Sequence, residues 1–167
     1  MVDFQRIRQD PLRNLVGFSV GEVRYALPIA AIREIVNPLD VIDLPDAPRE
    51  VRGVANYRGE VVPVVDLRVR FRLDPLPETR RTKWILIDIG GRLVALVVDT
   101  VSGVFGTQND LRPAPVLGGG EDSRGIAGVT MNDEEMVFVL DTTRFAVLTE
   151  PLVSAGSIAP AASKVFS

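Results

Sequence analysis

Residues 52–71 read RGVANYRGEVVPVVDLRVRF, and this stretch decides the fold prediction. It opens with an extended apolar step, turns at the sequence NYRG, and returns as a valine-rich run that ends at Asp66. Asn and Gly reach the positive φ angles of tight turns, and β-branched residues suit a pleated, half-buried strand. The stretch therefore predicts a β-hairpin, in which Pro63 indicates an edge strand or a bulge because proline removes a ladder donor.

Arg58 stands at the apex of the predicted turn, beside a glycine. An arginine at a loop tip faces solvent, and its rigid fork of donors suits carboxylate or carbonyl partners. Taken alone, the position is that of a solvated turn arginine. The residue becomes a candidate partner contact only with further support.

The same pattern recurs later in the chain. Residues 53–66 and 128–141 each begin with Gly-Val and end with Asp, with valines at matching places between them. Upstream, residues 21–36 resemble residues 90–105 in the same way, although the offset there is 69 residues rather than 75. Two similar halves predict a duplicated unit, and two copies predict a two-lobed fold rather than a solenoid.

Composition limits the possible functions. The chain has 167 residues, of which 46% are apolar and 25% charged, and its formal net charge is −3. This acidic balance argues against nucleic-acid binding, which requires a basic face. The sequence contains no cysteine and no histidine, so it has no disulfides or thiolate chemistry and lacks the commonest general base and metal ligand. No apolar run is long enough for a membrane span or a signal core, so we expect a cytoplasmic protein.

Many short strands with closely spaced turns predict an all-β fold with a few short helices. We expect residues 1–13 to form a flexible leader, residues 150–167 a flexible Ala/Ser/Pro tail, and residues 73–82 a Pro- and charge-rich connector. The lobes then fall at about 14–82 and 83–149, within one domain of residues 14–149. Residues 67–73 fit either a strand or a helical turn, and we prefer the turn. The other expected elements are strands at 14–20 and 22–27, a short helix or turn at 29–35, an extended segment at 41–44, paired strands at 83–89 and 92–99, a strand or turn at 101–105, paired strands at 126–131 and 136–140, and a closing helix from Asp141 through Leu148.

No constellation of catalytic residues emerges. The Ser and Thr residues have no His partner, and the glycine run at 118–120 lacks the Lys-Ser/Thr of a phosphate loop. Four aspartates lie at or near the ends of predicted strands, and we interpret them as caps of turns and short helices. The sequence therefore predicts a protein that is not an enzyme and has no cofactor and no metal. These aspartates are Asp66, Asp88, Asp99 and Asp141.

Several ordered motifs give the chain a family resemblance. They are Arg33-Glu34-Ile35, the prolines of LPDAP at 44–48, the glycine-bounded turn at 53–59, VPVVDLR at 62–68, and in the second half VVDTV at 97–101 and LRPAP at 111–115. Together they resemble the CheW family of bacterial chemotaxis coupling proteins. One departure is Tyr57, since the family usually has leucine before the turn arginine.

The resemblance implies two SH3-like, five-stranded β-barrels packed around a shared hydrophobic core. It also implies an adaptor that couples methyl-accepting chemoreceptors to the regulatory domain of the histidine kinase CheA, and that associates with other CheW-like proteins. Such an adaptor is cytoplasmic, is recruited to membrane-bound receptor arrays, and does not itself insert into the membrane. By this analogy the receptor-binding residues are Ile32, Gly53, Asn56, Arg58, Val98, Val101 and Val104, and the kinase-binding residues are Glu34 and Val41.

Two alternatives to the chemotaxis adaptor are open. A CheW-like scaffold also fits a non-flagellar two-component pathway, such as gliding motility or gene regulation, in which it replaces or competes with the main coupling protein. An enzyme of unknown type is disfavoured by the missing His, Cys and phosphate loop. Taken singly, the apolar candidates such as Ile32 and Val101 also fit ordinary barrel core.

Overall fold

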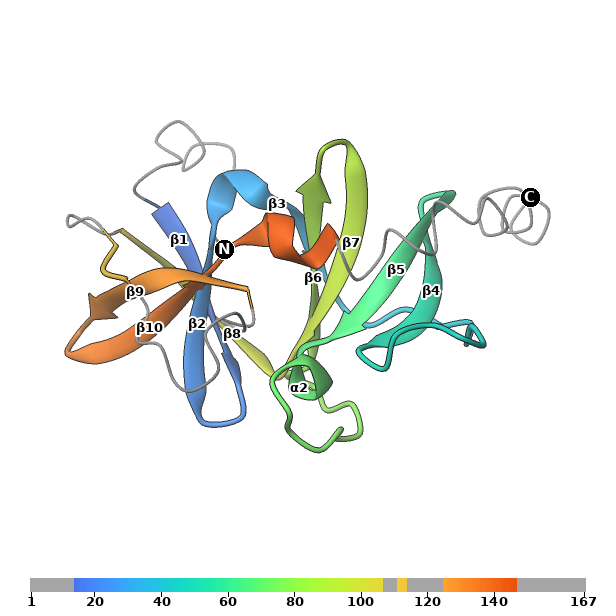
Figure 1. The fold of residues 1–167 in the computed structure, drawn as a ribbon, viewed down its shortest axis with the longest axis horizontal. Coiled ribbons are helices and arrows are strands. Elements are labelled where there is room, and N and C mark those ends of the chain that lie inside the picture. Colours follow the sequence, from blue (N-terminus) through green and yellow to red (C-terminus); the bar gives the residue numbers. More distant parts are fainter. Residues whose placement is uncertain (1–13, 107–110, 114–124, 147–167) are drawn as a thin grey trace.

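The computed structural model describes residues 14–106, 111–113 and 125–146. These residues form ten strands in two five-stranded sheets, which lie side by side in Figure 1. The mainly β prediction is confirmed. The strands are β1 (Asn14–Val20), β2 (Val23–Pro28), β3 (Ile32–Val36), β4 (Val51–Tyr57), β5 (Glu60–Asp66), β6 (Lys83–Ile89), β7 (Arg92–Val98), β8 (Thr100–Gly106), β9 (Ile126–Asn132) and β10 (Glu135–Leu140), with short helices η1 (Ile29–Ala31), α2 (Leu67–Arg70) and η2 (Thr142–Phe145).

The strand order differs from the predicted division of the chain. One sheet has the order β8-β1-β2-β10-β9 and the other β3-β6-β7-β5-β4, and we call them barrel A and barrel B. The predicted lobes of residues 14–82 and 83–149 are therefore wrong, because each barrel takes strands from both halves of the chain. Local turn signals predict which neighbouring strands pair, but the parallel pairs β2–β10 and β5–β7 join hairpins from different halves.

The way in which the two halves share strands follows the internal repeat. Hairpin β1–β2 occupies the place in barrel A that hairpin β6–β7 occupies in barrel B, each with a glycine turn. Hairpins β9–β10 and β4–β5 are equivalent in the same way. The chain passes from barrel A to barrel B through η1, and returns through Asp99 between β7 and β8. The structure thus supports a duplicated unit whose two copies have interchanged their first hairpins.

The core is shared between the barrels, as expected. Successive side chains of β6 alternate between two clusters: Ile85 and Ile87 face barrel A, whereas Trp84 and Leu86 face the interior of barrel B. Strand β7 alternates in the same manner, so both strands are buried on both faces and read as continuous apolar runs. The shared cluster also contains residues of barrel A and of η2, namely Val16, Phe18, Leu27, Leu140 and Phe145.

Several local predictions can be compared with the structure. The segment after Asp66 is a helical turn, α2, whereas residues 29–35 divide into η1 and the strand β3. Strand β5 is not an edge strand, because it lies between β7 and β4. Pairing with β7 begins only at Val64, one residue after Pro63, so the missing proline N–H falls just outside that ladder. The predicted leader at 1–13 and tail at 150–167 lie outside the described residues.

Candidate functional site

The turn between β4 and β5 has the backbone that its sequence predicts. Arg58 and Gly59 have φ angles of 51° and 83°, which is the conformation of a two-residue hairpin turn. The Asn56 side chain closes the turn, because its Oδ1 accepts a hydrogen bond from the Gly59 N–H at 2.8 Å. The Arg58 side chain is 74% exposed, so the turn presents it to solvent.

Three side chains form a cluster at this turn. The Tyr57 hydroxyl donates a hydrogen bond to Glu34 Oε2, while Arg58 Nη2 lies 3.2 Å from Glu34 Oε1. The Arg58 guanidinium also lies over the Tyr57 ring, 5.1 Å from its centroid, within the range of a cation–π contact. The cluster joins β3 to the β4–β5 turn, and Arg58 is the member that remains open to a partner.

Tyr57 is largely buried, with 9% of its surface exposed. Burial raises the pKa of its phenol above the usual value of 10.0, and the hydrogen bond and charge of Glu34 raise it further, whereas Arg58 and Arg33 act in the opposite direction. The phenol therefore stays protonated at neutral pH and acts as a donor to Glu34.

Gly53 holds an extended segment against β4. It has a φ of 148°, and a Cβ at this position would lie 2.1 Å from the Ile42 carbonyl oxygen. Ile42 and Val54 exchange two backbone hydrogen bonds, of 2.8 and 3.0 Å. Val41, one residue earlier, is half-buried and packs on the barrel B cluster. Gly53 is thus a close-approach glycine that positions the segment before β4.

The predicted apolar contact residues differ in how far they are buried. Ile32 is 2% exposed and Val98 0%, so both are core residues and present no surface to a partner. Val101 and Val104 are half-buried against the shared cluster, on β8, which is an edge strand of barrel A. Of the predicted apolar contacts, these two and Val41 retain exposed area.

Three of the four predicted aspartates cap their own turn or helix, whereas Asp99 accepts from the Gly21 N–H of the β1–β2 turn and pairs with Arg68. Asp66 Oδ1 accepts from the Arg68 N–H at 2.9 Å and begins α2, and Asp141 does the same for η2 through the Thr143 N–H at 3.0 Å. Asp88 closes the β6–β7 turn. Among the described residues, no group of three His, Cys, Asp or Glu side chains could hold a metal ion. Within the same residues, no helix is long and apolar enough to cross a membrane.

Tyr57 is the cluster member that the predicted site omits. The sequence did contain a signal for it, namely the aromatic residue where the resembling family has leucine. Its hydrogen bond to Glu34 was not accessible from sequence, because the two residues are 23 positions apart and belong to strands that are not neighbours in the sheet.

The fold and the site together define a class of protein. Two interlocked barrels of the SH3-like type enclose a common apolar core, and their polar features lie on hairpin turns and strand ends. The scaffolding protein TtCheW from Thermoanaerobacter tengcongensis has a similar structure, with a TM-score of 0.70 and 28% sequence identity over 77% of this chain and 88% of that one. The class is therefore a double-barrel scaffold protein.

The chain belongs to the CheW family, whose CheW-like domain matches residues 14–149. It is 32% identical over 125 residues to the chemotaxis protein CheW of Klebsiella aerogenes, covering 74% of this chain and 75% of that protein. It is also 29% identical over 143 residues to the protein FrzA of Myxococcus xanthus, covering 80% and 85%. The predicted family and its scaffold function are confirmed.

Proposed function

We propose that the chain is a non-catalytic adaptor that couples methyl-accepting chemoreceptors to the regulatory domain of the kinase CheA. The adaptor works in the cytoplasm, at membrane-bound receptor arrays, where it also meets other CheW-like proteins. The observation that carries the proposal is the Arg58–Tyr57–Glu34 cluster on an exposed turn. An arginine fixed in place by a ring and a carboxylate is preorganised for a partner's acidic or carbonyl group.

The predicted contact residues then take different roles. Arg58 and Asn56 form the exposed turn, and Glu34 beside them joins the proposed receptor surface to the proposed kinase surface. Val101 and Val104 offer a partly apolar strip on the edge strand β8. Ile32, Gly53 and Val98 support these surfaces from within, because the first and last are core residues and the glycine seats the segment that carries Val41.

The test is the substitution Arg58→Ala, measured by isothermal titration against the cognate kinase regulatory domain and a receptor-tip fragment. We expect association with at least one partner to weaken about tenfold or more, since a central interface arginine commonly costs 2 kcal/mol or more on truncation. The free energy of unfolding should change by no more than about 0.5 kcal/mol, because the side chain is largely exposed.

Arg24→Ala is the matched control. Arg24 is also an exposed arginine, paired with a glutamate, Glu135, on the other repeat hairpin. Its removal should leave both affinities within about twofold. Arg58→Lys should restore only part of the loss, because an ammonium lacks the planar two-donor fork. Unchanged affinity for both partners, or equal losses in the two alanine variants, would contradict the proposed role of Arg58.

A second candidate function rests on the relatives. The chain matches the protein FrzA of Myxococcus xanthus and the protein PilI of Pseudomonas aeruginosa, which are not named as chemotaxis proteins. The alternative is thus a CheW-like scaffold of a non-flagellar pathway. Deleting the gene separates the two: loss of swimming chemotaxis supports the first function, and intact chemotaxis with a defect in surface motility or gene regulation supports the second.

A further inference from the structure

A pocket of about 190 Å³ opens at the end of hairpin β4–β5 opposite to its turn. Arg52 and Asp66 lie at this end of the hairpin and Arg58 at the other, so six rungs at ~3.3 Å each place the pocket roughly 20 Å from the Arg58 cluster. Three arginines from three segments line it: Arg52 from β4, Arg68 from α2, and Arg81 from the loop before β6.

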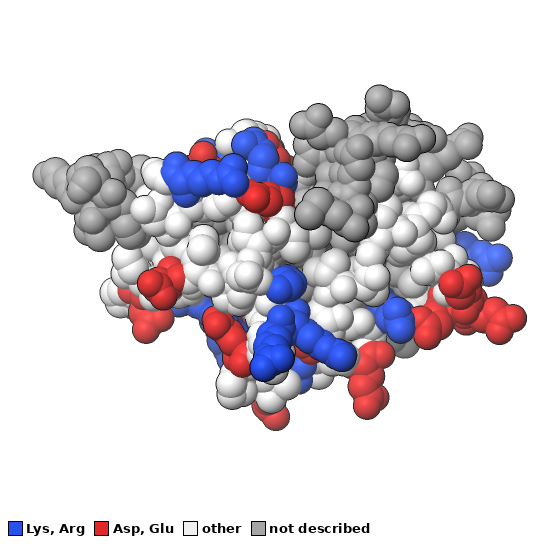
Figure 2. Space-filling view, turned by 180° about the vertical axis from the view of Figure 1, so that it is seen from behind, with Lys and Arg blue, Asp and Glu red and all other residues white. Residues whose placement is uncertain are grey.

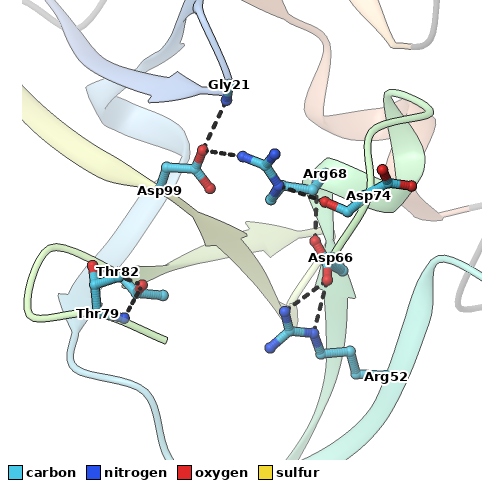
Figure 3. A network of polar contacts seen from close by, with 8 residues as sticks. All are labelled: Gly21, Arg52, Asp66, Arg68, Asp74, Thr79, Thr82 and Asp99. Carbon is cyan, nitrogen blue, oxygen red and sulfur yellow. Dashed lines mark hydrogen bonds and ion pairs between the residues drawn. The ribbon is translucent and has the colours of Figure 1, made fainter. Parts of the chain in front are cut away.

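The two recessed arginines are held in place by aspartates. Arg52 donates to Asp66 Oδ2 from both Nε and Nη2, at 2.9 and 2.7 Å. Arg68 Nη1 donates to Asp99 Oδ2 at 2.5 Å, and its Nε to the Asp74 carbonyl oxygen at 2.7 Å. Figure 3 shows the two ion pairs side by side, with Asp66 joining them through the Arg68 N–H.

These pairs leave donors unused. Arg52 Nη1 and Arg68 Nη2 have no hydrogen-bond acceptor within the described part of the chain, although the two side chains are only 27% and 15% exposed. Arg81 has an exposed side chain with no ion pair to any described residue. Guanidinium groups retain five donors each and are rarely left without acceptors when recessed. The pocket therefore faces three cations with free donors.

The rest of the wall adds hydroxyls and apolar surface. Thr79 and Thr82 close a tight loop, in which Thr82 Oγ1 accepts from the Thr79 N–H at 2.9 Å and Thr79 Oγ1 accepts from the Arg81 N–H at 3.1 Å. Leu76, Pro77 and Val97 supply the apolar part of the wall. The loop that carries Arg81 is thus fixed by its own hydroxyls rather than by a salt bridge.

The charges of the wall leave a positive excess. Three arginines face two aspartates, and each aspartate is already paired. A volume of 190 Å³ is that of about six waters at ~30 Å³ each, which accommodates one oxyanion with a short carbon body. Figure 2 shows Lys and Arg side chains gathered low in the middle of the rear face, with Asp and Glu side chains beside them.

We propose that this pocket binds a small organic anion through a carboxylate or phosphate group. The planar forks of Arg52, Arg68 and Arg81 match the oxygens of either group. The apolar wall receives the carbon body. The site is separate from the turn cluster, so its occupation does not depend on the adaptor function proposed above.

The experiment is isothermal titration of the full chain, in low-chloride buffer, with inorganic phosphate and with succinate. We expect one-site, saturable binding of at least one anion with a Kd of about 1 mM or tighter. Arg81→Ala should weaken that binding about tenfold or more. The matched control is Arg80→Ala, which removes an equal charge from the neighbouring exposed position that does not line the pocket, and it should change the Kd by less than about twofold.

The outcomes are distinct. If phosphate binds and succinate does not, the ligand carries a phosphate group. If succinate binds and phosphate does not, the ligand carries a carboxylate. No saturable binding of either anion, or an equal loss in the two alanine variants, means an adventitious ion only and overturns the proposal. An acidic peptide that binds in an Arg81-dependent way, while neither anion does, makes the pocket a protein-docking site and overturns the small-molecule assignment. Melting curves of both variants should match wild type, since neither arginine has an ion pair to a described residue.

Discussion

Hairpins β4–β5 and β9–β10 share one backbone design and differ in chemistry. Both turn through two residues of positive φ, Arg58 and Gly59 in the first and Asp133 and Glu134 in the second. In both, the fourth residue of the first strand bonds to an extended segment: Val54 bonds to Ile42 in one hairpin, and Val129 bonds to Arg112 in the other. The agreement extends to the close-approach glycines Gly53 and Gly128.

The differences lie at the two ends of these hairpins. One turn carries the Arg58 cluster, whereas the other carries acidic residues and an ion pair between Arg24 and Glu135. At the opposite end, Asp66 is buried and paired with Arg52, whereas Asp141 is half-buried, caps η2 and has only a 3.9 Å ion pair with Arg144. Positions where the copies agree therefore serve the fold, and positions where they disagree are the candidates for function.

The largest effect should come from the equivalent core valines. Val64→Asp and Val139→Asp should each cost more than about 4 kcal/mol and unfold the chain, because each buries an unpaired carboxylate. Met136→Asp, at an exposed position of β10, is the tolerated control. Circular dichroism decides, and a folded Val139→Asp variant would show that the two copies are not equivalent in their cores.

Replacing the two equivalent capping aspartates should change the free energy of unfolding by amounts that differ by about 2 kcal/mol. Asp66→Asn should cost about 3 kcal/mol, since it leaves Arg52 without its buried partner. Asp141→Asn should cost about 1 kcal/mol or less, because an amide oxygen can still cap η2 and its ion pair is exposed. Urea unfolding of the two variants measures the difference. Equal costs would mean that the Asp66–Arg52 pair adds nothing beyond the cap.

Alanine substitutions of the two close-approach glycines should differ less in their cost to stability than the two aspartate substitutions do. Gly53→Ala should cost about 2 kcal/mol, because its φ is 148° and the new Cβ would meet the Ile42 carbonyl carbon and oxygen. Gly128→Ala should cost about 1 kcal/mol. The new Cβ would lie 2.8 Å from the Arg112 carbonyl oxygen, but Gly128 does not have a positive φ. Thermal melts provide the comparison, and a larger loss at Gly128 would reverse the ranking.

The smallest expected effect is a pH dependence of the free energy of unfolding that arises from Tyr57 in hairpin β4–β5. The pKa of Tyr57 is raised in the folded state, so its contribution to stability is complete below the unfolded pKa of 10.0 and is lost as the pH rises through the folded value. The melting temperature of the wild type should therefore fall more steeply above pH 10 than that of Tyr57→Leu. Parallel pH curves for the two proteins would show that the phenol titrates alike in both states.

The sequence predicted the hairpins, their turns and the capping aspartates, because each depends on residues close together in the chain. It did not predict the exchange of hairpins between barrels, since both copies carry similar valine-rich strands and local signals cannot distinguish their partners. The family resemblance supplied Glu34 and Arg58 as separate candidate contacts, whereas their ion pair, the hydrogen bond of the Tyr57 hydroxyl and the arginine pocket required side-chain geometry. Long-range pairing of similar elements is thus the information that was missing.

The interchange of hairpins sets an order of assembly during synthesis. Barrel B is encoded by one uninterrupted segment, β3 through β7, and can form once residue 98 has left the ribosome. Strands β1 and β2 emerge first but must wait for β8, β9 and β10. The oldest part of the nascent chain is therefore among the last to be buried, and the faces of β6 and β7 that belong to the shared core stay incompletely covered until β8, β9 and β10 have been synthesised.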